Sequence, residues 1–212
     1  MSRPVLYGAD YSVYVRICRL ALLEKGVGHD LVPVDIFADG GAPAWYAERH
    51  PFGKIPAFEH AGLRLFETTA ITHYVDEAFA GPALQPGAAE DRAVMNQIIG
   101  LLDSYAYRTL VWDIYVERVA RPGQGRVPDE ARIAAALPRA RTCLAVLAGL
   151  KRPGAWLLGD QFTLADLHAA PMFAYFVKSG EGAELLAGEP SLVDWYGAIS
   201  ARASFKDTEP SE

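Results

Sequence analysis

The chain has 212 residues, of which 51% are hydrophobic and 22% are charged, and its formal charge is −6. This balance excludes a disordered or collagen-like chain. A negative charge without a basic tail argues against nucleic acid or an anionic membrane surface as a partner. No run of about 18 uncharged apolar residues is present and no signal-like segment follows the start, so we expect a cytoplasmic protein without a membrane span.

The cysteines and histidines give no sign of a metal or a redox centre. Cys18 and Cys143 lie in apolar helical patterns, which predicts two buried thiols and no disulfide. The five histidines are not spaced as metal ligands, and no dinucleotide fingerprint or phosphate loop is present. We therefore expect no metal and no redox dithiol.

The first eighty residues alternate between strand and helix patterns. The predicted order is a strand at 5–7, a helix at 12–25, a strand at 30–35, an irregular stretch at 37–51 with one helical turn, a hairpin at 56–59 and 63–66, and a helix at 68–79. Pro33 requires an edge or irregular position for the second strand. This order predicts a small α/β domain over residues 1–80.

A segment rich in glycine and proline follows, and we expect residues 81–89 to be a linker. Beyond it the pattern is helical almost throughout, with predicted helices at 90–118, 129–150, 163–178 and 191–203. Pro138 and Pro171 fall inside two of these helices, where the continuing apolar pattern predicts kinks, not ends. Residues 90–212 are therefore predicted to form an all-α domain.

Three separated motifs carry a family resemblance. They are Pro51-Phe-Gly-Lys-Ile-Pro-Ala-Phe-Glu59, Leu65-Phe-Glu-Thr-Thr-Ala-Ile71 and Phe162-Thr-Leu-Ala-Asp-Leu-His168. In this order they resemble the glutathione transferase superfamily, and the resemblance extends over essentially the whole chain. It implies a thioredoxin-like first domain that binds glutathione, followed by an all-helical domain that holds the second substrate.

The resemblance also implies how glutathione binds. A cis bond between Ile55 and Pro56 would present the Ile55 N–H and C=O to the cysteinyl backbone of glutathione, as one strand pairs with another. Glu67 would take the γ-glutamyl ammonium, and Thr68 at a helix start would bind its carboxylate through N–H and Oγ. The alternative is that Thr68 only caps its helix and Glu67 is a surface charge. Lys54 is a candidate for the glycyl carboxylate, or a solvated loop lysine.

The nucleophile is expected to be the glutathione thiol, activated by a hydrogen bond at a helix N-terminus. The spacing Ser12-x-x-x-Arg16 resembles the serine-type members, theta-like or phi-like, so Ser12 is the first candidate donor. Ser12 could also act only as an N-cap. Tyr11 is the second candidate and Tyr14 the third, since other classes use a tyrosine near this position. Cys18 lies too far into the helix for the cysteine-type classes.

The helical domain would supply the pocket for the electrophile. Aromatic side chains crowd its first helix, and we expect Tyr105, Trp112 and Tyr115, with Tyr14 from the first domain, to wall this pocket. An aromatic stripe at helical spacing is more often core than pocket. Thr163 and Asp166 form a capping box, which is a structural signature and not a catalytic one.

These residues predict a glutathione transferase that attacks small hydrophobic electrophiles with the glutathione thiolate. The resemblance implies a homodimer without nucleic-acid or membrane partners. Two alternatives stay open. One is a glutathione-dependent isomerase, dehalogenase or peroxidase on the same scaffold. The other is a non-catalytic binding protein that keeps the fold.

Overall fold

The computed structural model describes residues 2–210, which divide into two compact units. One unit comprises Met1–Gln85 together with Arg202–Glu212, and the other comprises Pro86–Ala201. The first division falls inside the expected linker. The second differs from the expected domain of residues 90–212, because the chain from Arg202 onward packs on a helix of the first unit.

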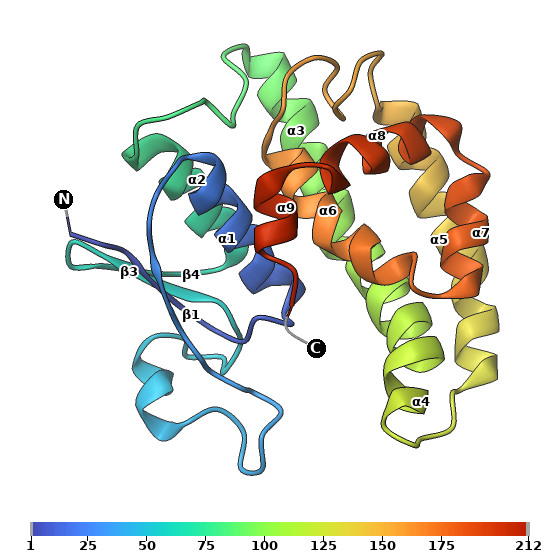
Figure 1. Cartoon of the computed structure of the whole chain (residues 1–212), viewed down its shortest axis with the longest axis horizontal. Coiled ribbons are helices and arrows are strands. Elements are labelled where there is room, and N and C mark those ends of the chain that lie inside the picture. Colours follow the sequence, from blue (N-terminus) through green and yellow to red (C-terminus); the bar gives the residue numbers. More distant parts are fainter. Residues whose placement is uncertain (1, 211–212) are drawn as a thin grey trace. The chain divides into compact units, whose positions relative to one another are not determined.

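The first unit is built on a four-stranded sheet in the order β2-β1-β3-β4 (Figure 1). The strands are β1 (Val5–Tyr7), β2 (Asp30–Val32), β3 (Ala57–His60) and β4 (Leu63–Phe66). β1 pairs in parallel with β2 and antiparallel with β3, and β3 pairs antiparallel with β4. Pro33 lies just beyond the edge strand β2, where no ladder hydrogen bond is required of it.

Two helices complete the predicted β-α-β and β-β-α order, namely α1 (Val13–Glu24) and α2 (Thr68–Ala78). The irregular stretch between β2 and β3 contains one short helix, η1 (Ala44–Glu48). The core between helices and sheet includes Leu6, Ile17, Phe58 and Ile71, all fully buried. The predicted thioredoxin-like order is therefore confirmed.

A buried ion pair fixes the chain where it leaves the first unit. The Lys25 Nζ lies 3.0 Å from the Asp76 carboxylate and also donates to the carbonyls of Asp76 and Pro82. The same carboxylate accepts hydrogen bonds from the backbone N–H groups of Leu84 and Gln85. Since every partner is bonded, this charge pair can be buried at little net cost, and it joins the ends of α1 and α2 to the following segment.

The second unit consists of helices. They are α3 (Ala89–Leu101), η2 (Leu102–Ala120), α4 (Arg121–Gly123), α5 (Glu130–Leu150), α6 (Leu164–Phe176), α7 (Gly180–Ala187) and α8 (Pro190–Ser200). α3 and η2 together form the predicted first helix, and in η2 the hydrogen bonding is of the π type. The sequence analysis missed α7. Pro138 and Pro171 lie inside α5 and α6, which continue past them as predicted.

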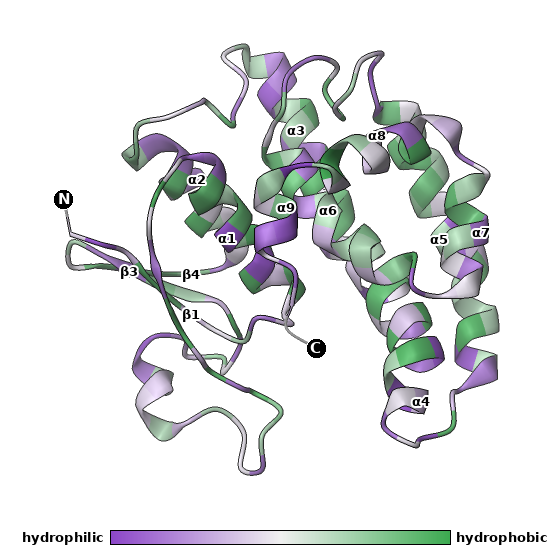
Figure 2. Ribbon diagram, viewed as in Figure 1, coloured by the Kyte–Doolittle hydropathy of each residue, from purple (hydrophilic) through white to green (hydrophobic). Residues whose placement is uncertain are grey.

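α6 is the central helix of the second unit. Every residue from Leu164 to Phe176 is buried, and Figure 2 shows the helix as mostly hydrophobic. Its one buried carboxylate, Asp166, accepts hydrogen bonds from the backbone N–H groups of Leu157 and Thr163 at 2.8 Å and from the Trp195 indole at 2.9 Å. Burial raises the pKa of Asp166, and these donors act in the opposite direction.

α5 is, among the described residues, the one helix that is long and apolar enough to cross a membrane by length and composition. Within the second unit it packs against η2. Two of its arginines, Arg132 and Arg139, form ion pairs with the buried Asp113 of η2. These contacts are those of a helix packed inside a folded unit.

Replacing Asp166 with alanine is expected to destabilise the protein by about 3 kcal/mol or more. The change removes a helix cap and leaves two backbone donors and one indole donor buried without an acceptor. The measurement is urea unfolding at neutral pH, followed by tryptophan fluorescence. The matched control is Asp194→Asn, on the exposed side of α8, which should change the unfolding free energy by less than about 0.5 kcal/mol. Equal effects of the two changes would contradict this role of Asp166.

Candidate functional site

The candidate site lies in the first unit, where three segments meet at the end of β1. A methyl group at Gly8 would lie 2.3 Å from a methyl carbon of Val15 and 3.3 Å from the Cβ of Ile55. The first distance is shorter than any real contact between non-bonded carbon atoms, so only glycine at this position lets Val15 come so close to the strand end. The first turn of α1 and the Ile55 loop are therefore held against the same strand end.

Ser12 is the N-cap of α1. Its backbone is extended, and its Oγ accepts a hydrogen bond from the Val15 N–H at 3.4 Å. This contact uses the oxygen as an acceptor, so the hydroxyl proton stays available for a ligand. Ser12 is partly exposed, and the first turn of α1 contains no acidic residue. The helix dipole at this position favours a negative charge such as a thiolate.

The two tyrosines beside Ser12 are placed differently. The Tyr11 hydroxyl donates to Asp35 at 2.6 Å, and its ring stacks on Phe37 with the ring centres 6.2 Å apart. This hydrogen bond lowers the pKa of Asp35. Since a phenol has one proton to donate, the pairing with Asp35 makes Tyr11 a weaker candidate donor than Ser12. Tyr14 lies within α1 and is half-buried.

Hydrogen bonds between its own residues hold the loop before β3 in place. The buried Tyr46 donates its hydroxyl to the Lys54 carbonyl at 2.8 Å, and the Gly53 N–H donates to the His50 carbonyl at 2.9 Å. The Ile55–Pro56 bond is cis, as the resemblance implies. No residue between 2 and 210 forms a hydrogen bond with the backbone N–H or C=O of Ile55. The Lys54 side chain is exposed.

The junction of β4 and α2 places Glu67 in an uncommon conformation. Its φ is +70°, a region that residues other than glycine rarely adopt. Glu67 is exposed, while Thr68 is buried at the first position of α2. Within the described chain the Thr68 N–H has no acceptor, as expected at a helix start. The Thr68 hydroxyl forms a hydrogen bond with the buried thiol of Cys18.

His50 lies beneath this junction. It is 3% exposed, and its ring packs on Phe66 with the ring centres 4.9 Å apart and on Tyr46. Its Nδ1 has no hydrogen-bond partner in residues 2–210. Burial lowers the pKa of His50, although the charge of Glu67 acts in the opposite direction. The neutral imidazole is therefore part of the packing that supports the site.

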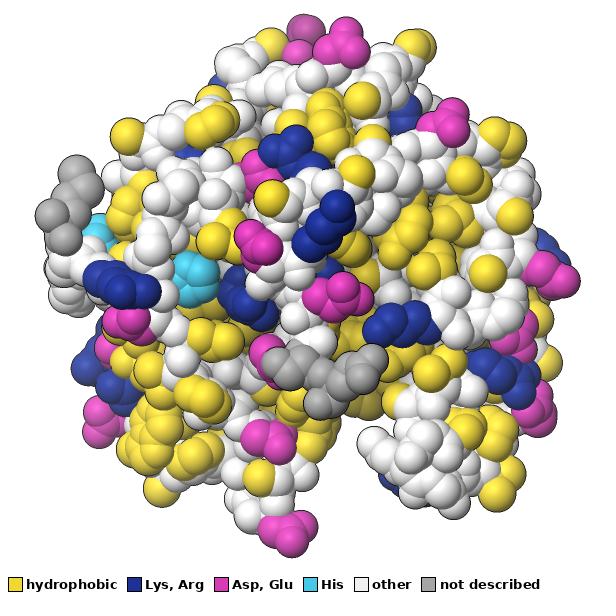
Figure 3. Space-filling model, in the orientation of Figure 1, with side chains coloured by type: hydrophobic (Ala, Val, Ile, Leu, Met, Phe, Trp, Pro, Cys, Tyr) yellow, Lys and Arg dark blue, Asp and Glu magenta, His cyan; other side chains and the backbone are white. Residues whose placement is uncertain are grey.

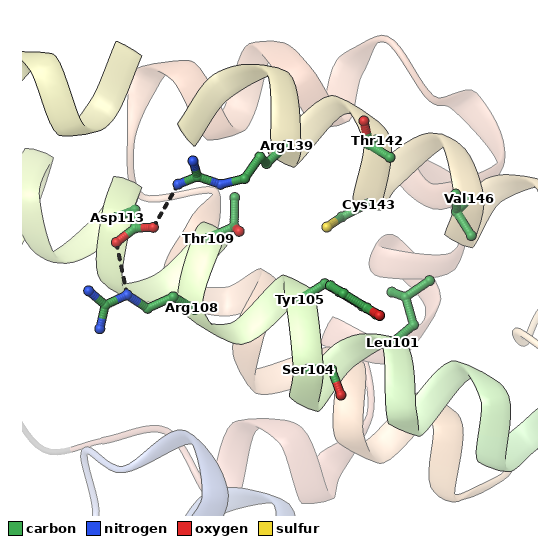
Figure 4. Close-up of a pocket in the computed structure, with 10 residues that line it drawn as sticks. All are labelled: Leu101, Ser104, Tyr105, Arg108, Thr109, Asp113, Arg139, Thr142, Cys143 and Val146. Carbon is green, nitrogen blue, oxygen red and sulfur yellow. Dashed lines mark hydrogen bonds and ion pairs between the residues drawn. The ribbon is translucent and has the colours of Figure 1, made fainter. Parts of the chain in front are cut away.

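The aromatic residues predicted to wall one pocket do not gather in one place. A pocket of about 560 Å³ lies between η2 and α5. In Figure 4 Tyr105 lies beside it, away from Asp113, Arg108 and Arg139. Tyr115 packs on Tyr175 of α6, with the ring centres 4.6 Å apart. Trp112 forms a hydrogen bond with Tyr107. Tyr105 thus faces a different neighbour from Tyr115, because side chains at spacing ten do not share one helix face.

Several supporting residues escaped the sequence analysis. Tyr46 and His50 hold the Ile55 loop, and Cys18 reaches Thr68 from α1. Their signal was weak, since each is a polar group on an otherwise buried side chain. Tyr46 reaches Lys54 eight residues further on, and Cys18 reaches Thr68 in another helix. Both cysteines are buried and free, as predicted. Among residues 2–210 no group of three His, Cys, Asp or Glu side chains could hold a metal ion.

A small α/β unit with a cis-proline loop, followed by an all-helical unit, defines the class of glutathione-dependent transferases. A family model described as the glutathione S-transferase N-terminal domain matches residues 6–83, and one described as the C-terminal domain matches residues 130–198. Glutathione S-transferase F13 of Arabidopsis thaliana is 30% identical over 207 residues, which cover 97% of this chain and 94% of that protein.

Solved structures agree with these matches. A glutathione S-transferase III in its apo form is 30% identical, with a TM-score of 0.86 and coverage of 98% of this chain and 95% of that one. A glutathione S-transferase of Methylobacillus flagellatus, solved with GSH bound, is 25% identical, with a TM-score of 0.79 and coverage of 98% and 100%. This chain belongs to the glutathione S-transferase family. The predicted family, fold and transferase activity are thereby confirmed.

The burial of His50 predicts that the protein loses stability in mild acid. Because its pKa is lowered by folding, the unfolded chain takes up a proton below pH of about 6.5 that the folded chain does not. Stability is therefore full above that pH and falls as the pH decreases through it. In urea titrations at pH 8.0 and 5.5, His50→Leu should lose less stability between the two pH values than wild type does.

Part of the pH dependence should remain in His50→Leu, since burial also lowers the pKa of His29. If His50→Leu and wild type lose the same stability between pH 8.0 and 5.5, His50 is not buried in the neutral form.

Proposed function

We propose that Ser12 is the residue of this transferase that stabilises the glutathione thiolate. The thiol loses its proton to solvent, and the Ser12 hydroxyl donates a hydrogen bond to the resulting sulfur anion. The sulfur then forms a bond to an electrophilic carbon of a small hydrophobic substrate, and the leaving group departs with the electron pair of the broken bond. A free thiol has a pKa near 8.5, so a donor at a helix N-terminus increases the reactive fraction at neutral pH.

One observation carries this assignment. The Ser12 hydroxyl accepts a backbone hydrogen bond and has no acceptor of its own within residues 2–210, whereas the Tyr11 hydroxyl donates to Asp35. Ser12 also stands at the positive end of the α1 dipole, with no acidic side chain in that first turn. Both properties are what a thiolate donor requires.

Glutathione is proposed to bind along the Ile55 loop and the start of α2. The unengaged Ile55 N–H and C=O pair with its cysteinyl unit, and the Thr68 N–H receives the γ-glutamyl carboxylate. The Thr68 hydroxyl forms a hydrogen bond with the Cys18 thiol and is proposed as a second group near the same carboxylate. The exposed carboxylate of Glu67 takes the ammonium group, and Lys54 the glycyl carboxylate.

The electrophile is proposed to contact Trp112 and Tyr115 of η2 in the second unit. Burial raises the pKa of Tyr115, so its phenol is neutral at physiological pH and offers an apolar face with one polar tip. Tyr105 is a weaker candidate, since it is 67% exposed and borders the groove between η2 and α5.

We also propose a cytoplasmic homodimer. Among the large aromatic side chains that the first unit exposes are Phe37 at 63%, Trp45 at 46% and Phe52 at 72%. Figure 3 shows hydrophobic side chains gathered where Figure 1 places η1. Exposed apolar groups of this kind mark association surfaces. Sedimentation velocity at micromolar concentration should give the mass of a dimer, and a monomer at all concentrations would contradict this assembly.

The role of Ser12 is tested by the ultraviolet absorbance of bound glutathione thiolate as a function of pH. Wild type should lower the pKa of the thiol well below its free value. Ser12→Ala should raise it again by about one unit, which is about tenfold less thiolate at neutral pH, and should reduce kcat/KM at least tenfold. The KM for the electrophile should change little.

Tyr11→Phe and Tyr14→Phe are the matched controls, because each removes only a hydroxyl. Both should keep the lowered pKa of the thiol. If Ser12→Ala keeps it and a tyrosine variant loses it, the donor is that tyrosine. If wild type does not lower the pKa of the thiol, the proposed thiolate site at Ser12 fails.

A further inference from the structure

The last described residues of the chain form a clamp on α1. This C-terminal clamp comprises residues 202–208 and contains α9 (Ala203–Asp207), and it packs beside α1 in the first unit (Figure 1). At one end Arg202 donates to the Glu24 carboxylate at 2.8 Å, and Ser204 donates to the same carboxylate. At the other end Thr208 lies fully buried.

Arg16 is the main contact of the C-terminal clamp. Its Nη2 donates to the Phe205 carbonyl at 2.8 Å and its Nε to the Thr208 hydroxyl at 3.2 Å. The guanidinium also lies over the Phe205 ring, 4.3 Å from its centre. Arg16 is only 3% exposed. A buried guanidinium without hydrogen bonds is costly, so Arg16 holds Phe205 and Thr208 against α1.

The order of contacts shows the direction of the clamp. Arg202 and Ser204 meet Glu24 at the last residue of α1, whereas Thr208 meets Arg16 and Arg19 nearer its beginning. The clamp thus runs antiparallel to α1, from its C-terminal end toward its N-terminal end. It reaches the turn that follows Ser12, since residues four apart on a helix lie on one face.

We propose that Arg16 is a positioning residue that uses the C-terminal clamp to hold the first turn of α1, and with it Ser12, at the glutathione sulfur. The inference rests on the proposed role of Ser12. α1 is fixed to the sheet through Gly8 and Val15 on its inner side, and the clamp fixes it from the outer side. A segment 190 residues from Ser12 in sequence is therefore part of the construction of the glutathione site.

Misplacing a donor by a fraction of an ångström weakens its hydrogen bond to sulfur without removing it. Loss of the clamp should thus raise the pKa of the bound thiol, while a protein merely made less stable would keep that pKa as long as it stays folded. The pKa of bound glutathione therefore separates a positioning role from a structural one.

The test uses Thr208→Val, which removes the acceptor of the Arg16 Nε with little change of volume, and Lys206→Ala as its control on the exposed side of α9. Thr208→Val should raise the pKa of bound glutathione by about half a unit, a threefold loss of thiolate at neutral pH, with kcat reduced more than the KM for the electrophile. Lys206→Ala should leave both unchanged. Circular dichroism at the assay temperature verifies that each variant is folded.

A double variant decides whether the effect passes through Ser12. In a Ser12→Ala background, Thr208→Val should raise the pKa of the thiol no further, because the donor is already gone. An additive rise, or a folded Thr208→Val with the wild-type pKa, would overturn the proposal. Arg16→Lys, which keeps the charge but not the fork of donors, should behave as Thr208→Val does. If Ser12→Ala alone leaves the pKa of the thiol unchanged, the assignment of Ser12 as donor fails instead. Hydrogen exchange at residues 13–16 then tests whether the C-terminal clamp holds the first turn of α1. Faster exchange in Thr208→Val supports this role, and unchanged exchange refutes it.

Discussion

The close approach at Gly8 is the constraint on which the glutathione site depends. Any side chain there would separate the strand end from Val15 in the first turn of α1 and from Ile55 in the loop before β3. The proposed site needs a hydroxyl that can donate to sulfur and backbone groups that can pair with the ligand. Next to Val15 is the Ser12 hydroxyl, and Ile55 offers backbone groups that no other part of residues 2–210 uses. Sterics at one position thus hold the first turn of α1 and the Ile55 loop against the same strand end.

Around this point, the polar groups that support the fold have hydrogen-bond partners within the protein. Several of the polar groups proposed to bind the ligand have none within residues 2–210. Asp76 and Asp166 are buried, and hydrogen bonds from several donors satisfy each of them. The Glu67 carboxylate and the Thr68 N–H form no hydrogen bond with the described residues. Buried polar groups are costly when unpaired, so open groups at one edge of a well-satisfied unit are the pattern of a binding site.

Much of this was predictable from the sequence. Strand and helix periodicity predicted the order of the first unit, since these signals are local. The motif around Ile55 and Pro56 implied the cis bond that the structure contains, and the binding role of this loop stays a prediction. Contacts between segments far apart in the chain could not be predicted from the sequence. The pairing of Arg16 with Phe205 and Thr208 joins residues about 190 positions apart, and no local pattern reports it. The role of the aromatic stripe on η2 stays a prediction, because the spacing of Tyr105 and Tyr115 says nothing of which helix packs against each.

The central claim is that glutathione binds through backbone groups of the Ile55 loop and the start of α2, with its sulfur at Ser12. The most direct measurement is an amide-resolved NMR titration of the labelled protein with glutathione. The account predicts that the largest shifts fall on the amides of Ile55, Thr68 and the first turn of α1. Saturable shifts confined to other segments, with these amides unmoved, would contradict it.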